Sequence, residues 1–221
     1  MEDILLIDKP AGITSFDVIR KLRRKLGVQK LGHAGTRDPM ATGLLMVGVG
    51  EGTKKLQEYL KLSKVYEAEV LLGVRTDTGD REGKILERLE GEKVRRLKEG
   101  EIQKVLELLV RKIVLPVPRY SAIKVGGKRL YAMARKGEEF EPPKKEMEVV
   151  RLVFRGIKNE ESGIRGEGIG IVVKFEVEVT SGTYIRSLAE EIGRRLGVPS
   201  TLWSLRRTRI GEFTIENAHK L

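Results

Sequence analysis

The sequence contains no cysteine among its 221 residues and only two histidines, His33 and His219. Without thiols the chain has no disulfide, no thiolate nucleophile and no cysteine-ligated zinc. Two histidines this far apart also disfavour a histidine metal site. The first ten residues carry acids where a signal peptide needs bases. We therefore expect a cytoplasmic protein that needs no metal.

Long apolar runs and aromatic residues are also scarce. No apolar run approaches the ~18 residues that a transmembrane helix needs. Aromatic residues make up 5% of the chain, few for a protein that binds RNA mainly by base stacking. The hydrophobic fraction of 40% is nevertheless enough for a sizeable core. Residues 1–221 are expected to form a single domain, or two subdomains around a shared core.

Acidic residues are fewer than basic ones, and the formal net charge is +11. The excess lies mostly in residues 111–221, which carry 22 basic and 14 acidic side chains. Five arginines and no acid occur between Ile192 and Gly211. A basic domain of this kind favours a polyanionic partner, nucleic acid first.

The hydrophobic pattern predicts interleaved strands and helices without a regular βαβ rhythm. Alternation or short apolar runs predict strands over 4–7, 44–49, 66–72 and 173–179. Helical periodicity predicts helices over 15–26, 53–61, 101–112 and 183–196. Residues 124–145 are basic and rich in turns, and residues 159–170 are typical of a mobile hairpin. The pattern predicts an α+β fold with a mixed sheet.

The segment from Gly32 to Gly43 is the most informative one. Its three glycines and one proline predict a rigid, tightly turned loop. An aspartate before proline is usually a turn former. Asp38, however, follows His33 by five residues and has basic sequence on both sides.

This segment, GHAGTRDPMATGLL, resembles the signature motif of the TruB family of tRNA pseudouridine synthases. Further blocks resemble the family in the same order, and together they span residues 4 to 215: DKPAGITS at 8–15, KVY at 64–66, RTDTGD at 75–80, PRYSAIK at 118–124, GTYIRSL at 182–188 and LRRT at 205–208. The resemblance implies the pseudouridine synthase fold, with a mixed, mostly antiparallel sheet, flanking helices and a basic cleft.

Three catalytic residues follow from the resemblance: Asp38, Tyr66 and Arg186. The reaction cleaves the N1–C1′ bond of uridine, turns the base and joins C5 to C1′. A carboxylate under C1′ either attacks it, or stabilises its positive charge and takes a sugar proton; the residues leave both routes open. Arg186 is the expected cation beside Asp38 in a closed pocket. Tyr66 is expected to stack on the flipped base and is implicated in removing the C5 proton.

The resemblance also implies substrate-binding residues. His33 matches the residue that inserts into the RNA loop, and Leu205 the residue that packs on the base. Lys9 is included with them, although we interpret it as supporting the wall of the active site. Residues 124–145 resemble a thumb insertion that folds over RNA. Phosphate contacts are expected from the remaining basic residues: Lys124, Lys128, Arg129, Arg206 and Arg207.

Two departures from the family pattern stand out. Position 37 is arginine where the family usually has leucine. Arg37 either points outward to an RNA phosphate, which we favour, or pairs with Asp38 and slows the chemistry. The sequence also has no segment matching the C-terminal PUA-type domain that family members commonly carry. Asp77, Asp80 and Glu82 could hold Mg²⁺, but we interpret them as a polar turn.

The expected function is conversion of uridine to pseudouridine at position 55 in the T-arm stem-loop of tRNA. The enzyme should act as a monomer without any cofactor. One alternative is a guide-dependent synthase of the dyskerin type, and another is a non-catalytic RNA-binding or tRNA-folding module.

Overall fold

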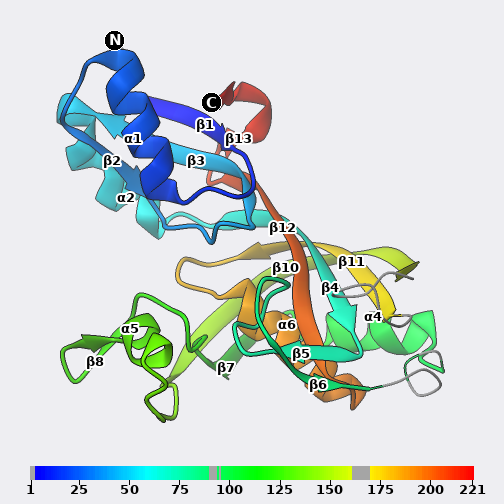
Figure 1. Ribbon diagram of the computed structural model, residues 1–221. Coiled ribbons are helices and arrows are strands. Elements are labelled where there is room, and N and C mark those ends of the chain that lie inside the picture. Colours follow the sequence, from blue (N-terminus) through cyan, green and yellow to red (C-terminus); the bar gives the residue numbers. More distant parts are fainter. Residues whose placement is uncertain (1–2, 90–93, 95, 161–169) are drawn as a thin grey trace. The chain divides into compact units, whose positions relative to one another are not determined.

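A computed structural model describes residues 3–89, 94, 96–160 and 170–221 (Figure 1). The described chain forms two compact units. Unit 1 contains residues 1–67, 176–181 and 204–221, and unit 2 contains residues 68–175 and 182–203. Three long strands contribute residues to both units: β4 (Lys64–Leu72), β11 (Gly170–Val179) and β12 (Ser200–Ile210).

Unit 1 holds both ends of the chain. Its strands follow the hydrogen-bonded order β14-β1-β3-β12, with β2 on β3 and β13 on β12. β1 and β3 are antiparallel, whereas β3 and β12 are parallel. The elements are β1 (Ile4–Lys9), α1 (Ser15–Leu26), β2 (Leu31–Ala34), β3 (Thr42–Val49), a 3₁₀ turn (Gly50–Lys55), α2 (Leu56–Lys61), β13 (Phe213–Thr214), a 3₁₀ turn (Ile215–Asn217) and β14 (His219–Lys220).

Helix α1 shows how local sequence positions an element of unit 1. Thr14 caps its first turn, and Gly27 ends it in the left-handed conformation that glycine favours. One face buries Val18, Ile19 and Leu22 against the strands. Figure 1 shows α1 lying against β1, β2 and β3. The opposite face of the helix is solvent-exposed and entirely polar except for Phe16.

Unit 2 contains the sheet order β12-β4-β11-β10-β7 and two small hairpins. Helices α4 and α6 pack on each other and on this sheet. The elements are β5 (Val74–Thr76), β6 (Ile85–Arg88), α4 (Glu99–Glu107), β7 (Lys112–Pro116), β8 (Lys124–Val125), β9 (Lys128–Arg129), α5 (Leu130–Arg135), β10 (Lys144–Glu160) and α6 (Ile185–Leu196).

The predicted fold class is confirmed: the fold is α+β with a mixed, mostly antiparallel sheet. The helix predicted over 101–112 is too long, because α4 ends at Glu107 and β7 already begins at Lys112. Most of the hairpin predicted over 159–170 lies outside the described residues. No helix among the described residues is long and apolar enough to cross a membrane. The basic cleft stays a prediction.

Candidate active site

The loop that carries Asp38 joins β2 to β3 in unit 1 and is held by the first strand. The Lys9 ammonium donates to the carbonyls of Pro39 (3.2 Å), Pro10 (2.8 Å) and Ile13 (2.6 Å). The Gly12 amide also donates to the Pro39 carbonyl, at 2.9 Å. Lys9 is fully buried, and these contacts fix the residue after Asp38, while its predicted support of the active-site wall stays a prediction.

Arg37 is buried beside Asp38, with 5% of its surface exposed. Its amide donates to the Ser15 hydroxyl at 3.0 Å, and its guanidinium donates to the Thr42 carbonyl. The guanidinium also lies 5.9 Å from the centre of the Tyr66 ring. The expectation that Arg37 points outward to an RNA phosphate is therefore wrong. The loop directs the side chain inward, where it contacts the Thr42 carbonyl and the Tyr66 ring.

Burial, together with the charge of the neighbouring Arg207, lowers the pKa of Arg37 to about 9, while Tyr66 and Asp38 act in the opposite direction. The alternative expectation, that Arg37 pairs with Asp38 and slows the chemistry, stays a prediction.

Arg207 is the second buried arginine of unit 1. Strand β12 runs beside β3 and places Arg207 opposite Gly43, and its Nε donates to the Leu44 carbonyl at 2.8 Å. A β-carbon at position 43 would collide with the Arg207 carbonyl, so the last glycine of the Gly32–Gly43 segment allows the strands to approach. Arg207 is buried, and its prediction as an RNA phosphate contact is wrong.

Unit 1 therefore contains two buried arginines, Arg37 and Arg207, near the loop that carries Asp38. Four nitrogens there have no hydrogen-bond partner within the described residues: Arg37 Nε, Arg37 Nη1, Arg207 Nη2 and His33 Nδ1. Buried cations with open donor positions are costly unless an anion or a polar ligand approaches them. Because Arg37 and Arg207 are both buried, this positive charge is suited to a neighbouring carboxylate rather than to an RNA phosphate.

Tyr66, Leu205 and His33 are half-buried side chains of unit 1. Tyr66 is the third residue of β4 and lies beneath Arg37. Leu205 lies within β12, two residues before the buried Arg207. The His33 ring meets the Phe16 ring edge to face, with centroids 5.3 Å apart. Burial, assisted by Arg207, lowers the pKa of His33, so this imidazole is neutral at physiological pH.

Arg206 points to the other side of β12 and is bound by a carboxylate. Its two terminal nitrogens donate to Asp8 Oδ1 (3.2 Å) and Oδ2 (2.9 Å). This forked pair ties β12 to the end of β1. The side chain remains partly exposed, so its predicted phosphate contact stays a prediction.

Arg186 is the second residue of α6 and belongs to unit 2. Its Nη1 donates to the Thr78 carbonyl and its Nη2 to the Tyr120 carbonyl, both at 3.0 Å. Asp80 Oδ2 lies 3.8 Å from Nη1, and both side chains are 7% exposed. Because Asp38 belongs to unit 1, the predicted pair between Asp38 and Arg186 stays a prediction.

Asp80 was predicted only as part of a polar turn, but it also lies beside Arg186. Its Oδ1 accepts from the Thr78 hydroxyl (2.7 Å) and the Glu82 amide (3.1 Å), which makes the predicted turn. Its other oxygen faces Arg186. Residues 75–80 already formed a block resembling the family, and that resemblance was the signal available for Asp80. Within the described ranges, no three potential metal-ligating side chains gather closely.

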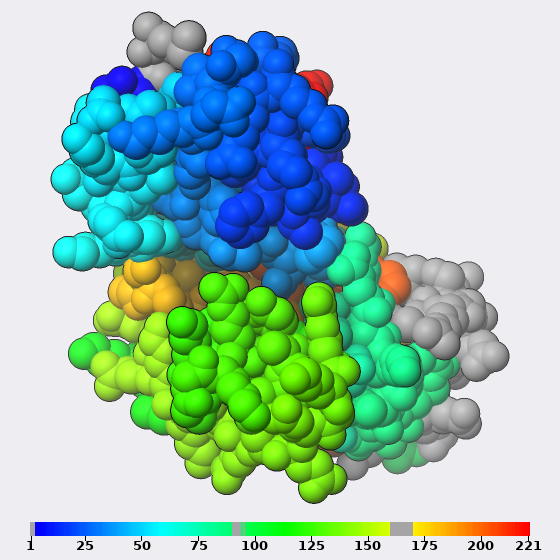
Figure 2. Space-filling view, turned by 60° about the vertical axis from the view of Figure 1, so that its left-hand side comes forward, coloured from blue at the N-terminus to red at the C-terminus, as the bar shows by residue number. Residues whose placement is uncertain are grey.

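The thumb-like segment forms a short hairpin and a helix in unit 2. Gly126 and Gly127, both with positive φ, turn β8 into β9, and α5 follows. Arg129 and Arg135 lie 5.9 and 5.5 Å from the centre of the Tyr131 ring. Lys124, Lys128 and Arg129 are exposed, and Figure 2 shows this green segment at the surface. These three side chains are sterically available to phosphates.

A match to a family model decides the relationship of this chain. Residues 23–185 match the model described as "TruB family pseudouridylate synthase (N terminal domain)". The chain belongs to the TruB family. Sequence relatives agree with this membership. The protein named "tRNA pseudouridine synthase B" of Thermobifida fusca (strain YX) is 42% identical over 100% of this chain and 73% of its own length. Its namesake in Leifsonia xyli subsp. xyli (strain CTCB07) is 43% identical over 99% and 70%.

Two solved structures contain chains with a similar fold. The "Crystal Structure of a Cbf5-Nop10-Gar1 Complex" contains a chain with a TM-score of 0.70 and 28% identity, covering 99% of this chain and 52% of that one. The "Structure of H/ACA RNP bound to a substrate RNA containing 2'-deoxyuridine" gives 0.69 and 26%, covering 98% and 50%. This chain therefore spans about half of those two longer chains.

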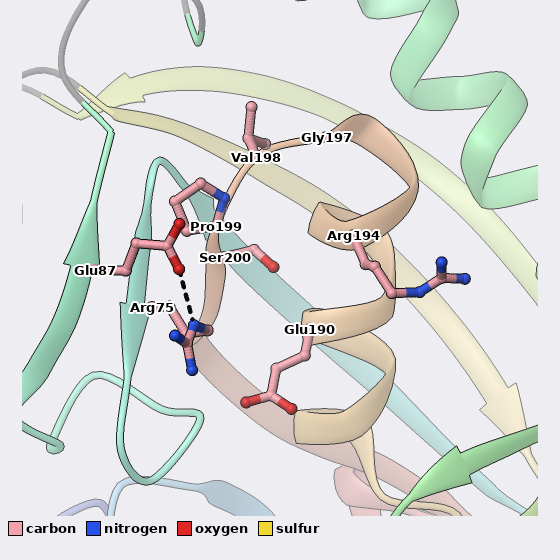
Figure 3. Close-up of a pocket in the computed structure, with 8 residues that line it drawn as sticks. All are labelled: Arg75, Glu87, Glu190, Arg194, Gly197, Val198, Pro199 and Ser200. Carbon is pink, nitrogen blue, oxygen red and sulfur yellow. Dashed lines mark hydrogen bonds and ion pairs between the residues drawn. The ribbon is translucent and has the colours of Figure 1, made fainter.

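One pocket of this TruB-family chain is lined by none of the predicted site residues. It encloses about 330 Å³ in unit 2 between the end of α6 and the start of β12. Figure 3 shows Arg75 paired with Glu87 on one side (3.1 Å) and Glu190 projecting from α6 on the other. Burial raises the pKa of Glu190, although Arg75 and Arg186 oppose that shift.

Proposed function

We propose that this protein is a tRNA pseudouridine synthase that acts, without a cofactor, on the uridine at position 55 in the T-arm loop. Support comes chiefly from the relatives named tRNA pseudouridine synthase B, which align with nearly the whole chain at 42–43% identity. The loop that carries Asp38, fixed by Lys9 and flanked by buried cations, supports the same proposal. A cytoplasmic location follows from the proposed substrate.

In the proposed reaction, Asp38 is the carboxylate beneath C1′. The N1–C1′ bond breaks with its electron pair leaving on uracil, and the base turns until C5 faces C1′. The new C5–C1′ bond forms, the proton on C5 is removed and a proton is added at N1, so no atom is gained or lost. Asp38 either forms a transient bond to C1′ that breaks as C5 joins C1′, or stabilises the charge on C1′ and takes a sugar proton that returns to the sugar when C5–C1′ forms. Tyr66 lies beneath the flipped base and assists removal of the C5 proton.

The deciding experiment is an assay of pseudouridine in an unmodified tRNA transcript, with neither guide RNA nor partner protein. We expect product in the parent transcript and none in a matched transcript with cytidine at position 55. Product only after addition of a guide RNA would favour the dyskerin-type alternative. Binding without product under either condition would favour a non-catalytic module.

Affinity for tRNA should fall steeply with salt. The exposed cations of the thumb, and the partly exposed Arg206 of β12, are expected to displace counterions from the RNA backbone. With four phosphates neutralised, log K should fall with log salt with a slope of about −3. Filter binding between low and physiological salt measures this slope. A flat dependence would contradict binding through phosphates.

A substitution of Arg37 tests whether its side chain is buried or faces the RNA. Because its guanidinium is buried, Arg37→Leu should leave the salt slope unchanged. Arg129→Leu, which removes an exposed thumb cation, should reduce the slope by about 0.7–0.9. Both slopes come from the same binding titrations. An equal reduction in the two variants would return Arg37 to the RNA-facing surface.

A further inference from the structure

The solvent face of helix α1 carries positive charge for which neither the fold nor the proposed chemistry accounts. Residues 20–30 contain six basic side chains and no acid. All six are exposed: Arg20, Lys21, Arg23, Arg24, Lys25 and Lys30. The apolar face of the same helix is buried against the strands. The cations are therefore fixed outward in a dense array.

These cations divide into two flanks of the helix. Positions 16, 20, 23 and 24 follow the i, i+4, i+7, i+8 spacing of one helical stripe. This α1 stripe consists of Phe16, Arg20, Arg23 and Arg24. Lys21 and Lys25 lie four residues apart on the opposite flank. Both flanks of the helix carry positive charge, but only the α1 stripe includes an exposed aromatic residue, Phe16.

The α1 stripe leads away from the candidate active site. The Ser15 hydroxyl, at the start of α1, accepts from the amide of Arg37, which precedes Asp38. Phe16 is 65% exposed, although it is a large apolar side chain, and it meets His33 edge to face. An exposed aromatic ring beside a row of arginines is typical of surfaces that stack a base and hold its backbone.

The arginine end of the stripe also forms a groove. Arg20, Arg23, Arg24 and Gln29 line a hollow of about 270 Å³. Arg20 pairs with Asp17. The guanidinium groups of Arg23 and Arg24 make no hydrogen bond or ion pair within the described residues. Cations in the last turn do stabilise the helix dipole, but that effect requires neither the groove nor an exposed Phe16.

We propose that the α1 stripe binds a segment of RNA backbone next to the target uridine, with Phe16 stacking on a base and Arg23 and Arg24 holding phosphates. This inference deepens the proposed function and rests on RNA as its substrate. From Phe16 to Arg24 the helix rises about 12 Å. Phosphates on one strand of a duplex follow each other every ~3.4 Å along its axis. The stripe is thus long enough for about three consecutive phosphates.

Two charge-matched double variants test the stripe. Arg23→Gln/Arg24→Gln removes the two arginines of the groove, and Lys21→Gln/Lys25→Gln removes two cations of the opposite flank. Affinity for the tRNA transcript is measured across a salt series, and thermal melting confirms that both variants fold. The groove variant should lose roughly tenfold in affinity and reduce the salt slope by about 1.4–1.8. The control should lose less than twofold.

A substitution of Phe16 tests the proposed base stacking independently of the arginines. Phe16→Leu keeps an apolar side chain but loses the ring, and it should weaken binding roughly tenfold with the salt slope unchanged. Equal losses of tRNA affinity in the two double variants, or no loss in the groove variant, would contradict the proposal that the α1 stripe binds RNA. The parent protein separates this result from the proposed function: a parent that binds tRNA without forming pseudouridine contradicts the function but not the stripe.

Discussion

Replacing Asp38 by asparagine is expected to abolish pseudouridine formation while tRNA affinity stays within about twofold. Asparagine keeps the size and polarity of the side chain but can neither attack C1′ nor balance positive charge on the sugar. A loss of about 10³-fold or more in the single-turnover rate is the expected scale for a group that acts on the reacting atoms. Affinity should persist because phosphate contacts determine it.

The measurement is single-turnover formation of pseudouridine at saturating enzyme, together with a binding titration on the same transcript. Asp3→Asn serves as the control, because Asp3 pairs with Lys55 at the surface and has no part in the proposed site. If Asp38→Asn retained a tenth of the parental rate, the catalytic assignment would have to be abandoned. A large loss of affinity would instead indicate that Asp38 holds the loop in shape.

The elements that the sequence predicted well are those in which apolar residues recur with a single regular period. In α1 and α6 apolar residues recur at helical spacing before a glycine, and both helices end at the predicted position. Strand β11 alternates regularly and was also predicted. Strand β12 was not predicted, because LWSLRRTRI mixes apolar residues with closely spaced arginines. That strand nevertheless carries Leu205, Arg206 and Arg207.

The candidate site was predictable as a set of residues but not as an arrangement. Asp38, Tyr66 and Arg186 could be named because their blocks resemble a family. Arg37 and Arg207 were expected to be exposed because arginine is rarely buried. Their burial depends on strand pairing between β3 and β12, which brings together residues about 165 positions apart. Local sequence does not contain that information, and it likewise does not reveal that Asp80 turns toward Arg186.

Arg186→Lys should reduce the single-turnover rate by about 10²-fold while changing the melting temperature little. The arginine fork reaches the carbonyls of Thr78 and Tyr120 with different nitrogens. A lysine keeps the charge but has a single ammonium, which cannot occupy both positions. The cation should then sit in the wrong place for the proposed carboxylate. Arg194→Lys on the exposed side of the same helix is the matched control and should keep the parental rate.

The decisive measurement for Arg186 is a double-mutant cycle with Asp38. If Arg186 acts through the Asp38 carboxylate, Arg186→Ala should reduce the rate strongly in the parent and hardly at all in the Asp38→Asn background. Equal reductions in the two backgrounds would mean that the arginine acts independently of Asp38, through the 75–80 loop alone. Unchanged kinetics in Arg186→Ala would remove it from the mechanism. The cycle thereby tests in solution whether residues of the two units act together during the reaction.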